Sequence, residues 1–317
     1  MDPVCYFDAH CDTVHACFVR AAAMRRNDGQ ADLERGKVFA RWAQVFALYE
    51  NSAHVSERHM FALLKREYAF FQAEMARNAD LVAHCRTAAE VETANAAGKI
   101  AAILSVEGAE LLDCAPENLQ LVSDWGVRCI NITWNHANAL SGSNVEQPER
   151  GLTAQGKAFV REMYRVGILP DVSHLSDRGF WDIVELGLGP VLASHSNLRS
   201  VCGHTRNLTD DQLKAIAASG GGVGLNLYVP FVGQQGTLDA FCRHIDRAVE
   251  LGGAHCLGIG ADLDGCDRLA AGLSGVQDLP KLYAMLKAQG YEKAFLDALF
   301  YSNLLHLVLP EYVSNAQ

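Results

Sequence analysis

Apolar, strand-like runs alternate with amphipathic, helix-like stretches along the whole chain, and this alternation limits the fold more than any other feature. Eight such runs can be counted, and helical stretches lie between most of them. Repeated strand–helix units predict parallel strands joined by right-handed crossovers. The pattern in these 317 residues therefore favours an α/β fold, a (β/α)8 barrel of the TIM type, as a single domain over residues 1–317.

The expected elements can be placed on the chain by their apolar spacing and their start and stop signals. Strands are expected at residues 4–9, 39–49, 100–106, 127–133, 169–172, 191–194, 222–227 and 256–261. Helices are expected at residues 57–77, 88–97, 116–125, 154–166, 177–186, 210–219 and 239–251, and closing helices at 276–288 and 292–308. Thr209 and Thr237 are good N-cap residues for two of these helices.

A doubly wound open sheet is the competing architecture, because it uses similar segments. That fold commonly carries a glycine-rich nucleotide loop after its first strand, and no such loop follows residues 4–9. Polar side chains also follow many different strands, and a barrel gathers all of those strand ends at one mouth. Both observations favour the closed barrel.

The composition excludes several classes of partner. The formal net charge is −10 and no dense run of Lys or Arg occurs, so neither nucleic acid nor an anionic membrane surface is an expected partner. No apolar stretch reaches the length of a membrane span. The ten cysteines are scattered without a C-x-x-C pair, which argues against zinc-ribbon, iron–sulfur and thioredoxin-type centres. The N-terminal residues lack a signal-peptide pattern, so we expect a cytoplasmic protein with reduced thiols.

His10 and Asp12 stand one residue apart at the end of the first apolar run. Side chains at positions i and i+2 of a strand share a face, so an imidazole and a carboxylate here can reach one metal ion. Later strand-like runs end in further candidate ligands. These are Glu107, His174, His195, Asp262 and Asp264. Any one of them alone is more simply a helix cap or a polar core residue, but five or more at strand ends predict a site.

The residue types in this set indicate the metal and its chemistry. Three imidazoles with carboxylates and no thiolate suit zinc, or another borderline divalent ion, better than Ca²⁺ or Mg²⁺. The set is too large for one tetrahedral ion, and a carboxylate such as Glu107 can bridge two. Two bridged ions lower the pKa of a shared water and polarise a carbonyl oxygen. The sequence therefore predicts two Zn²⁺ ions, or other divalent ions, and hydrolytic chemistry.

At these residues the chain resembles the membrane (renal) dipeptidase family, peptidase family M19, one of the amidohydrolase-like, metal-dependent hydrolases. The matching stretches follow the family's order and extend over essentially the whole chain. They are residues 7–12 (Phe-Asp-Ala-His-Cys-Asp), 105–108 (Ser-Val-Glu-Gly), 171–174 (Asp-Val-Ser-His), 193–197 (Ala-Ser-His-Ser-Asn), 204–208 (His-Thr-Arg-Asn-Leu) and 260–265 (Gly-Ala-Asp-Leu-Asp-Gly). Residues 302–305 (Ser-Asn-Leu-Leu) are similar to the family's C-terminal helix with its asparagine.

The resemblance implies a role for each matching residue. His10, Asp12 and Glu107 would hold one zinc ion, and Glu107, His174 and His195 would hold the other. Arg206 would bind the terminal carboxylate of the substrate through its guanidinium fork, and Asp262 would move protons beside the catalytic water. Arg206 has a simpler alternative as a helix cap or a partner of Asp210, and Asp262 as an anchor for an arginine or a loop amide.

One departure from the family pattern affects the substrate pocket. Mammalian members carry a substrate-contacting histidine after the fourth strand, whereas this chain has Trp134 at that place and His136 two residues later. Trp134 would form an apolar wall, or His136 would turn in to replace the missing hydrogen bond. Tyr228 also lines the pocket by resemblance, although a tyrosine at a strand end is equally often a packing residue.

The resemblance implies a dizinc dipeptidase that cleaves L-Xaa-D/L-Xaa dipeptides by attack of a metal-bound hydroxide, of the type EC 3.4.13.19. An N-acyl-D-amino-acid deacylase or another amidohydrolase on the same metal centre is the alternative, and Trp134 motivates it. A barrel that only binds a metal or ligand is a third interpretation, which the complete ligand set disfavours. The family commonly dimerises, so a homodimer is a further expectation.

Overall fold

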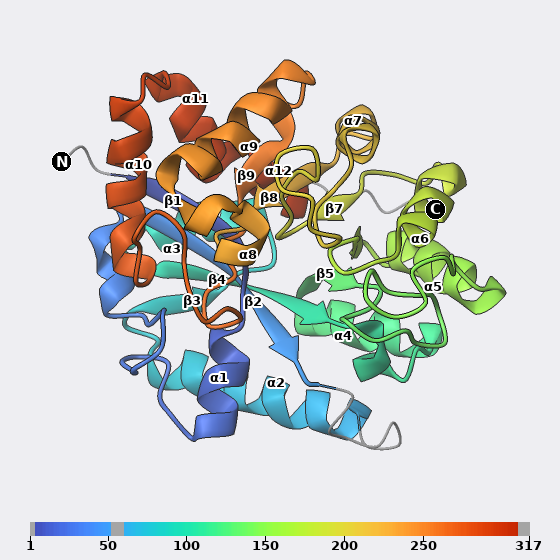
Figure 1. Ribbon diagram of the computed structural model, residues 1–317. Coiled ribbons are helices and arrows are strands. Elements are labelled where there is room, and N and C mark those ends of the chain that lie inside the picture. The colour runs from blue at the N-terminus through green and yellow to red at the C-terminus, as the bar shows by residue number, and fades with distance from the viewer. Residues whose placement is uncertain (1–3, 52–59, 310–317) are drawn as a thin grey trace.

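The computed structural model describes residues 4–51 and 60–309, and within them nine parallel strands form one sheet (Figure 1). The strands are β1 Cys5–Cys11, β2 Arg41–Tyr49, β3 Val82–His84, β4 Ile100–Glu107, β5 Val127–Asn131, β6 Leu169–Asp171, β7 Leu192–Ala193, β8 Gly222–Leu225 and β9 Leu257–Ile259. All eight predicted strands are present. The short strand β3 is the additional one.

The sheet closes into the predicted barrel of eight strands. Its order is β2-β1-β9-β8-β7-β6-β5-β4, and β2 pairs with β4 to complete the ring. Strand β3 stands outside the ring and extends only the first residues of β4, with Val82 opposite Ile100. Three residues of β3 are too few to give a clear periodic signal, so the sequence did not indicate this strand.

Helices surround the strands in Figure 1 and connect their ends. They are α1 Thr13–Arg20, α2 Met60–Arg77, α3 Ala88–Ala96, α4 Leu119–Trp125, α5 Ala154–Arg165, α6 Asp177–Leu186, α7 Asp210–Ala218, α8 Val229–Val232, α9 Leu238–Glu250, α10 Leu279–Ala288, α11 Lys293–Asp297 and α12 Asn303–Val308. Thr209 and Thr237 cap α7 and α9 as expected, each accepting a hydrogen bond from a first-turn backbone N–H. The first three residues of the predicted helix 57–77 lie outside the described residues. Neither α1 nor α8 was predicted.

The predicted closing helix at 292–308 is interrupted in its middle. One π-helical turn, Ala298–Ser302, joins α11 to α12. At the start of α12, the Asn303 side chain donates hydrogen bonds to the backbone oxygens of Ala254 and Leu257. The asparagine thereby fastens the closing helices to the chain that enters β9.

Two strands are longer than the sequence indicated, and this changes how their ligands are presented. Strand β1 continues through His10 to Cys11, and Glu107 is the last residue of β4. Asp12 lies beyond β1 with φ −99° and ψ 15°, so it leaves the extended conformation that the same-face argument assumed. The backbone turns at Asp12, yet its side chain still reaches the imidazole of His10.

The shortest strand depends on two glycines for its packing. Strand β7 has two residues, and the carbonyl oxygen of Ser194 directly after it lies against Gly224 and Gly260. A Cβ atom at these positions would come within 1.9 and 1.8 Å of that oxygen. The glycines therefore allow the close approach that places the next residue, His195, at the mouth of the barrel.

In the described part of the chain, none of the helices combines the length and the apolar character that crossing a membrane requires.

Candidate metal centre and substrate cavity

A cavity of about 240 Å³ opens at the carboxyl ends of the barrel strands. Its wall combines carboxylates and imidazoles with aromatic rings. The lining residues are Asp12, His15, Tyr49, Glu107, Trp134, Asn135, His174, Tyr228, Phe231, Asp262, Asp264 and Gly265. This position agrees with the rule that barrel enzymes place their sites on the loops after the strands. The volume lies just below the usual range for ligand pockets, which suits a small ligand.

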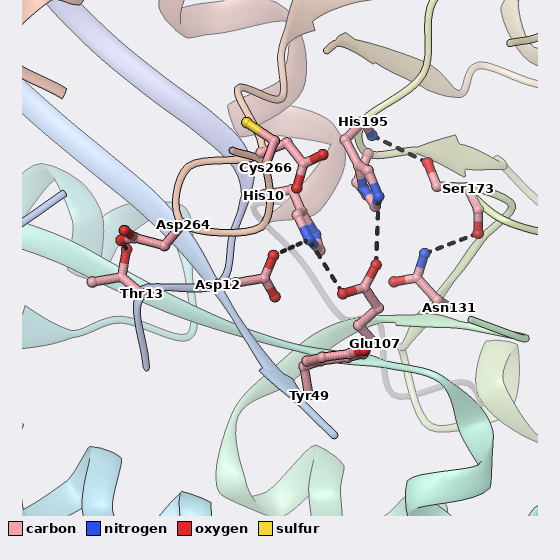
Figure 2. A network of polar contacts seen from close by, with 12 residues as sticks. His10, Asp12, Thr13, Tyr49, Glu107, Asn131, Ser173, His195, Asp264 and Cys266 are labelled. Atoms are coloured by element: carbon pink, nitrogen blue, oxygen red, sulfur yellow. Dashed lines mark hydrogen bonds and ion pairs between the residues drawn. The ribbon is translucent and has the colours of Figure 1, made fainter. Parts of the chain in front are cut away.

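Glu107 lies at the centre of the predicted ligands, and each of its oxygens faces a different group. Its Oε2 lies 3.6 Å from Nε2 of His10, which is itself 3.6 Å from Oδ2 of Asp12. Its Oε1 lies 3.0 Å from Nε2 of His174 and 3.5 Å from Nε2 of His195. Figure 2 shows Glu107 pointing between His10 and His195. The structure thus brings all five predicted metal ligands together, in two groups that share one carboxylate.

The distances within the second group fit ligands of one ion. The two Nε2 atoms of His174 and His195 lie 3.0 Å apart and both face Oε1 of Glu107. Nitrogen ligands at the usual 2.0–2.1 Å from a tetrahedral zinc ion stand about 3.3 Å from each other. A common cation would account for the convergence of two imidazole nitrogens and a carboxylate oxygen here.

The other ring nitrogens fix which side of each imidazole faces the site. Nδ1 of His174 lies 2.8 Å from Oδ1 of Asn135, and Nδ1 of His195 lies 2.7 Å from the hydroxyl of Ser194. With the proton on Nδ1 donated to these oxygens, Nε2 is left as a lone-pair donor toward the centre. Orientation of this kind is usual for metal-binding histidines.

The first group contains buried polar atoms that the described chain leaves unsatisfied. Nε2 of His10 and Oδ1 of Asp12 have no hydrogen-bond partner within residues 4–51 and 60–309. Buried polar atoms of native proteins are almost always paired. His10 and Asp12 also form a compact potential metal-binding group with Asp262, and His10 forms a second with Glu107 and His195. These residues therefore fit bound divalent cations.

Burial and charge set the protonation of the centre. Burial raises the pKa of Glu107 to about 7, and the neighbouring His10 limits that rise. Burial lowers the pKa of His174 and His195 well below 6.5, and Arg206 and His10 add to this effect. Both imidazoles are therefore neutral at pH 7, as metal ligands must be. Burial opposes charge on His10, but Glu107 and Asp12 outweigh it and raise its pKa.

Asp262 faces the same centre from the loop after β9. Its Oδ2 accepts a hydrogen bond of 3.0 Å from the amide of Asn226, and burial raises its pKa above the ordinary value. Its φ of +62° is a left-handed conformation, which is unusual for an aspartate. Its other oxygen, Oδ1, lies beside Gly265, where a Cβ atom would come within 2.3 Å of it and within 2.1 Å of Asp12 Oδ2. The glycine thus keeps the space above both carboxylates open.

Asp264 lines the cavity, but its carboxylate is already engaged. Its Oδ2 accepts hydrogen bonds from the hydroxyl of Thr13, at 2.7 Å, and the backbone N–H of Ala31. Its Oδ1 accepts one of 2.6 Å from the backbone N–H of Gln30. The structure therefore accounts for Asp264 as the residue that ties the loop before η1 Arg35–Val38 to the start of α1. It is not brought into the group around Glu107.

Arg206 is almost completely buried, at 4% exposure, beside the metal centre. Its Nη1 donates a hydrogen bond of 2.9 Å to the hydroxyl of Ser196, and its guanidinium carbon lies 5.7 Å from the ring centre of Phe231. Its Nε and Nη2 are buried without a partner among the described residues. Asp210 instead pairs with Arg247, so the alternative pairing considered for Arg206 is absent.

The other predicted substrate residues divide between the cavity and its rim. Trp134 and Tyr228 both line the cavity. His136 points elsewhere, since its Nδ1 lies 3.3 Å from the carboxylate of Glu146 and its side chain is 40% exposed. In this structure Trp134 is the wall residue, and His136 does not turn in to replace a hydrogen bond.

Several residues of the site were not predicted. Asn135 and Asn226 orient His174 and Asp262, Gly265 leaves room for the carboxylates, and His15 lines the cavity with Glu67 behind it. Asn135 lies between two predicted substrate residues, and Gly265 ends a stretch that matches the family, so these two had a signal in the sequence. The others act through contacts between distant segments.

Comparison with known proteins identifies the same family that the sequence motifs resemble. The family profile described as membrane dipeptidase (peptidase family M19) matches residues 1–316. An uncharacterized protein encoded in the pqqA 5′ region of Klebsiella pneumoniae is 33% identical over 258 residues, which cover 78% of this chain and 95% of that protein. The predicted resemblance is confirmed.

Two crystal structures of metallopeptidases are similar over nearly the whole chain. One is a metallo peptidase from Rhodobacter sphaeroides, liganded with a phosphinate mimic of the dipeptide L-Ala-D-Ala, with a TM-score of 0.88 and 27% identity, covering 97% of this chain and 99% of that one. The other is a dipeptidase of family M19, with a TM-score of 0.87 and 28% identity, covering 97% of this chain and 98% of that one. The TIM-type barrel is likewise confirmed.

Proposed function

The chain belongs to the membrane dipeptidase family, peptidase family M19, and is a metallohydrolase. We propose that it hydrolyses dipeptides and uses two divalent metal ions, most simply zinc. The observation that carries this proposal is that the two carboxylate oxygens of Glu107 face different groups of ligands. Oε2 faces His10, which lies beside Asp12, and Oε1 faces His174 and His195. A glutamate in this position suits a bridge between two ions.

The substrate class is inferred from a relative and from the shape of this cavity. The similar Rhodobacter sphaeroides enzyme binds a phosphinate mimic of L-Ala-D-Ala, and this cavity of about 240 Å³ suits a ligand of that size. Arg206 supports the same conclusion, because its two free buried donors suit a planar carboxylate. A buried arginine that binds the terminal carboxylate would limit substrates to short peptides.

Each residue contributes one part of the proposed mechanism. Two divalent ions bound here would polarise the scissile carbonyl and increase the acidity of a water molecule. The five ligands would hold the two ions in place. The hydrogen bonds at Nδ1 of His174 and His195 leave Nε2 of each imidazole unprotonated and directed at the centre. Asp262 accepts the proton of the attacking water and donates it to the leaving nitrogen, while Asn226 holds its Oδ2.

A dipeptide panel with purified, metal-replete protein tests the proposal. We expect hydrolysis of L-Xaa-L-Xaa and L-Xaa-D-Xaa dipeptides, loss of activity with a chelator, and recovery when zinc is restored. Metal analysis should find about two ions per chain. A metal-replete protein that leaves the whole panel intact would overturn the dipeptidase proposal.

A second candidate function follows from Trp134. This ring lines the cavity at the position where mammalian members have a histidine, so it offers an apolar surface to an acyl chain. An N-acyl-D-amino-acid deacylase would use the same metal centre. The ratio of kcat/KM for N-acyl amino acids to that for dipeptides separates the two activities. The cytoplasmic location and the homodimer remain predictions.

A further inference from the structure

A half-buried histidine and a buried glutamate form a pair at the cavity wall, and neither is one of the predicted metal ligands. His15 stands in the first turn of α1 and lines the cavity, and Glu67 stands behind it on α2. Nδ1 of His15 lies 3.5 Å from Oε1 of Glu67, with side-chain exposures of 19% and 3%. A carboxylate buried this deeply requires a partner, and the imidazole provides one.

Tyr49 holds this pair in place at the end of β2. Its backbone N–H donates a hydrogen bond of 3.0 Å to Oε2 of Glu67. Its ring meets the ring of His15 edge to face, with centres 4.8 Å apart. Oε2 of Glu67 is thus hydrogen-bonded, and its Oε1 lies in the 3.5 Å ion-pair contact with His15, which has Nδ1 toward the protein. Its other ring nitrogen, Nε2, remains for a ligand in the cavity.

The pair lies by β1 and β2, at a different part of the barrel mouth from the arginine that we assign to the substrate carboxylate, which follows β7. Around the closed ring, three strands separate β2 from β7 in either direction. His15 follows β1, the neighbour of β2, and contacts Tyr49 at the end of β2, whereas Arg206 follows β7. The five predicted metal ligands stand at or just after the ends of β1, β4, β6 and β7. A dipeptide with its terminal carboxylate at Arg206 and its peptide bond at these ligands would extend its N-terminal residue toward the cavity wall that contains His15.

The chemistry of this side of the cavity favours a ligand that accepts hydrogen bonds. The carboxylate of Asp264 is engaged by Thr13, Gln30 and Ala31, and Glu67 is engaged as described. Burial opposes charge on His15, but its contact with Glu67 outweighs burial and raises the pKa of the imidazole. The buried carboxylate of Glu67 at 3.5 Å favours the doubly protonated imidazole, whose Nε2–H would then face the cavity and match a carboxylate.

We propose that His15, held by Glu67, is a specificity-determining residue that selects an acidic side chain on the N-terminal residue of the dipeptide. This inference rests on the proposed dipeptidase function and extends it to the substrate class. The terminal carboxylate of such a substrate would bind Arg206, and its side-chain carboxylate would bind His15.

The test compares substrates that differ in charge but hardly in shape. We expect wild-type kcat/KM for L-Glu-L-Ala to exceed that for L-Gln-L-Ala at least tenfold, which corresponds to about 1.4 kcal/mol. His15→Gln should reduce this ratio to within about twofold of unity. Glu67→Gln keeps an acceptor for the Tyr49 N–H but removes the charge, and it should reduce the ratio partly. His306→Gln, an exposed histidine on α12, is the matched control and should keep the wild-type ratio.

Binding measurements separate this proposal from the dipeptidase proposal. Calorimetric Kd values for the phosphinate isosteres of L-Glu-L-Ala and L-Gln-L-Ala require no turnover, so they test His15 even if every dipeptide resists hydrolysis. A wild-type protein that does not distinguish Glu from Gln, or that prefers L-Lys-L-Ala, overturns the role of His15. Unchanged selectivity in a folded His15→Gln variant does the same.

Discussion

Asn135 accepts the Nδ1 proton of His174 over a distance of 2.8 Å, and this one contact determines which face of the imidazole meets Glu107. An amide oxygen can only accept a hydrogen bond, so the protonated nitrogen of His174 is the one that faces Asn135. The unprotonated Nε2 then lies 3.0 Å from Oε1 of Glu107. A residue that touches no proposed ligand atom thus prepares one of the five ligands.

Removing this acceptor should weaken the metal centre without unfolding the protein. We expect Asn135→Leu to lower the affinity for divalent metal by about 10–100-fold, as is usual when a partner of a metal-binding histidine is lost. Asn135→Asp keeps an acceptor and should bind metal close to the wild-type level. Competition with a chromophoric chelator measures both affinities. Equal affinity of the leucine variant and the wild type would contradict the role of this contact.

Glu107→Gln tests the bridge directly. The amide has one oxygen, and its NH₂ group cannot ligate a cation as the second carboxylate oxygen does. We therefore expect the metal content to fall from about two ions to about one or fewer, and kcat to fall at least about a thousandfold. Elemental analysis after exhaustive dialysis gives the metal content. A variant that retains two tightly bound ions would show that Glu107 is not the shared ligand.

Gly265→Ala tests the space above the carboxylates. The added Cβ atom would lie 2.1 Å from Oδ2 of Asp12 and 2.3 Å from Oδ1 of Asp262, well inside contact distance. We expect metal binding and dipeptide hydrolysis to fall by at least about a hundredfold, since even small displacements of this kind are costly to catalysis. Gly203→Ala is the control, because a Cβ atom there meets nothing within 4 Å. Wild-type activity in both variants would refute the steric argument.

The buried His244 should make the protein less stable in mild acid. Its Nδ1 accepts a hydrogen bond from the Leu198 N–H, and its Nε2 contacts the Val232 carbonyl, both at 3.1 Å. Burial lowers its pKa from 6.5 to about 4, so between these values the unfolded chain binds a proton that the folded chain excludes. Stability from this residue is therefore present above pH 6.5 and is lost as the pH falls toward 4, by about 3 kcal/mol in total.

Urea titrations between pH 7 and 4, with chelator present, measure this dependence. The His244→Gln variant should be less stable than the wild type at pH 7 because it loses a buried contact. Its free energy of unfolding should nevertheless fall less steeply below pH 6.5. Parallel curves for the two proteins would show that His244 does not contribute to the acid sensitivity.

The residues that sequence could place are those that follow from the position of a strand end. Parallel strands of a barrel deliver their carboxyl ends to one mouth, so His10, Glu107 and His195 were predictable once the strands were recognised. The exact bounds mattered less, since Glu107 proved to be the last residue of β4 and not the one after it. The apolar spacing of a strand specifies its existence better than its end.

The residues that sequence could not place depend on contacts between distant segments. His15 became part of the cavity only because α1, which had not been recognised, turns directly after Asp12. Its partner Glu67 is 52 positions further along the chain. The same holds for Asp264, which is bound by residues more than 230 positions away and therefore lies outside the metal group. Both aspartates follow the same predicted strand, so their position in the sequence could not show that only Asp262 faces the metal centre.

The mouth of the barrel brings together the segment after β1, which carries residue 15, and the segment after β7, which carries residue 206, although the two are far apart in the sequence. A substitution near residue 15 can therefore change the contacts at one end of the substrate without altering the segment around residue 206. The specificity for one residue of the dipeptide can thus change while the metal ligands stay the same.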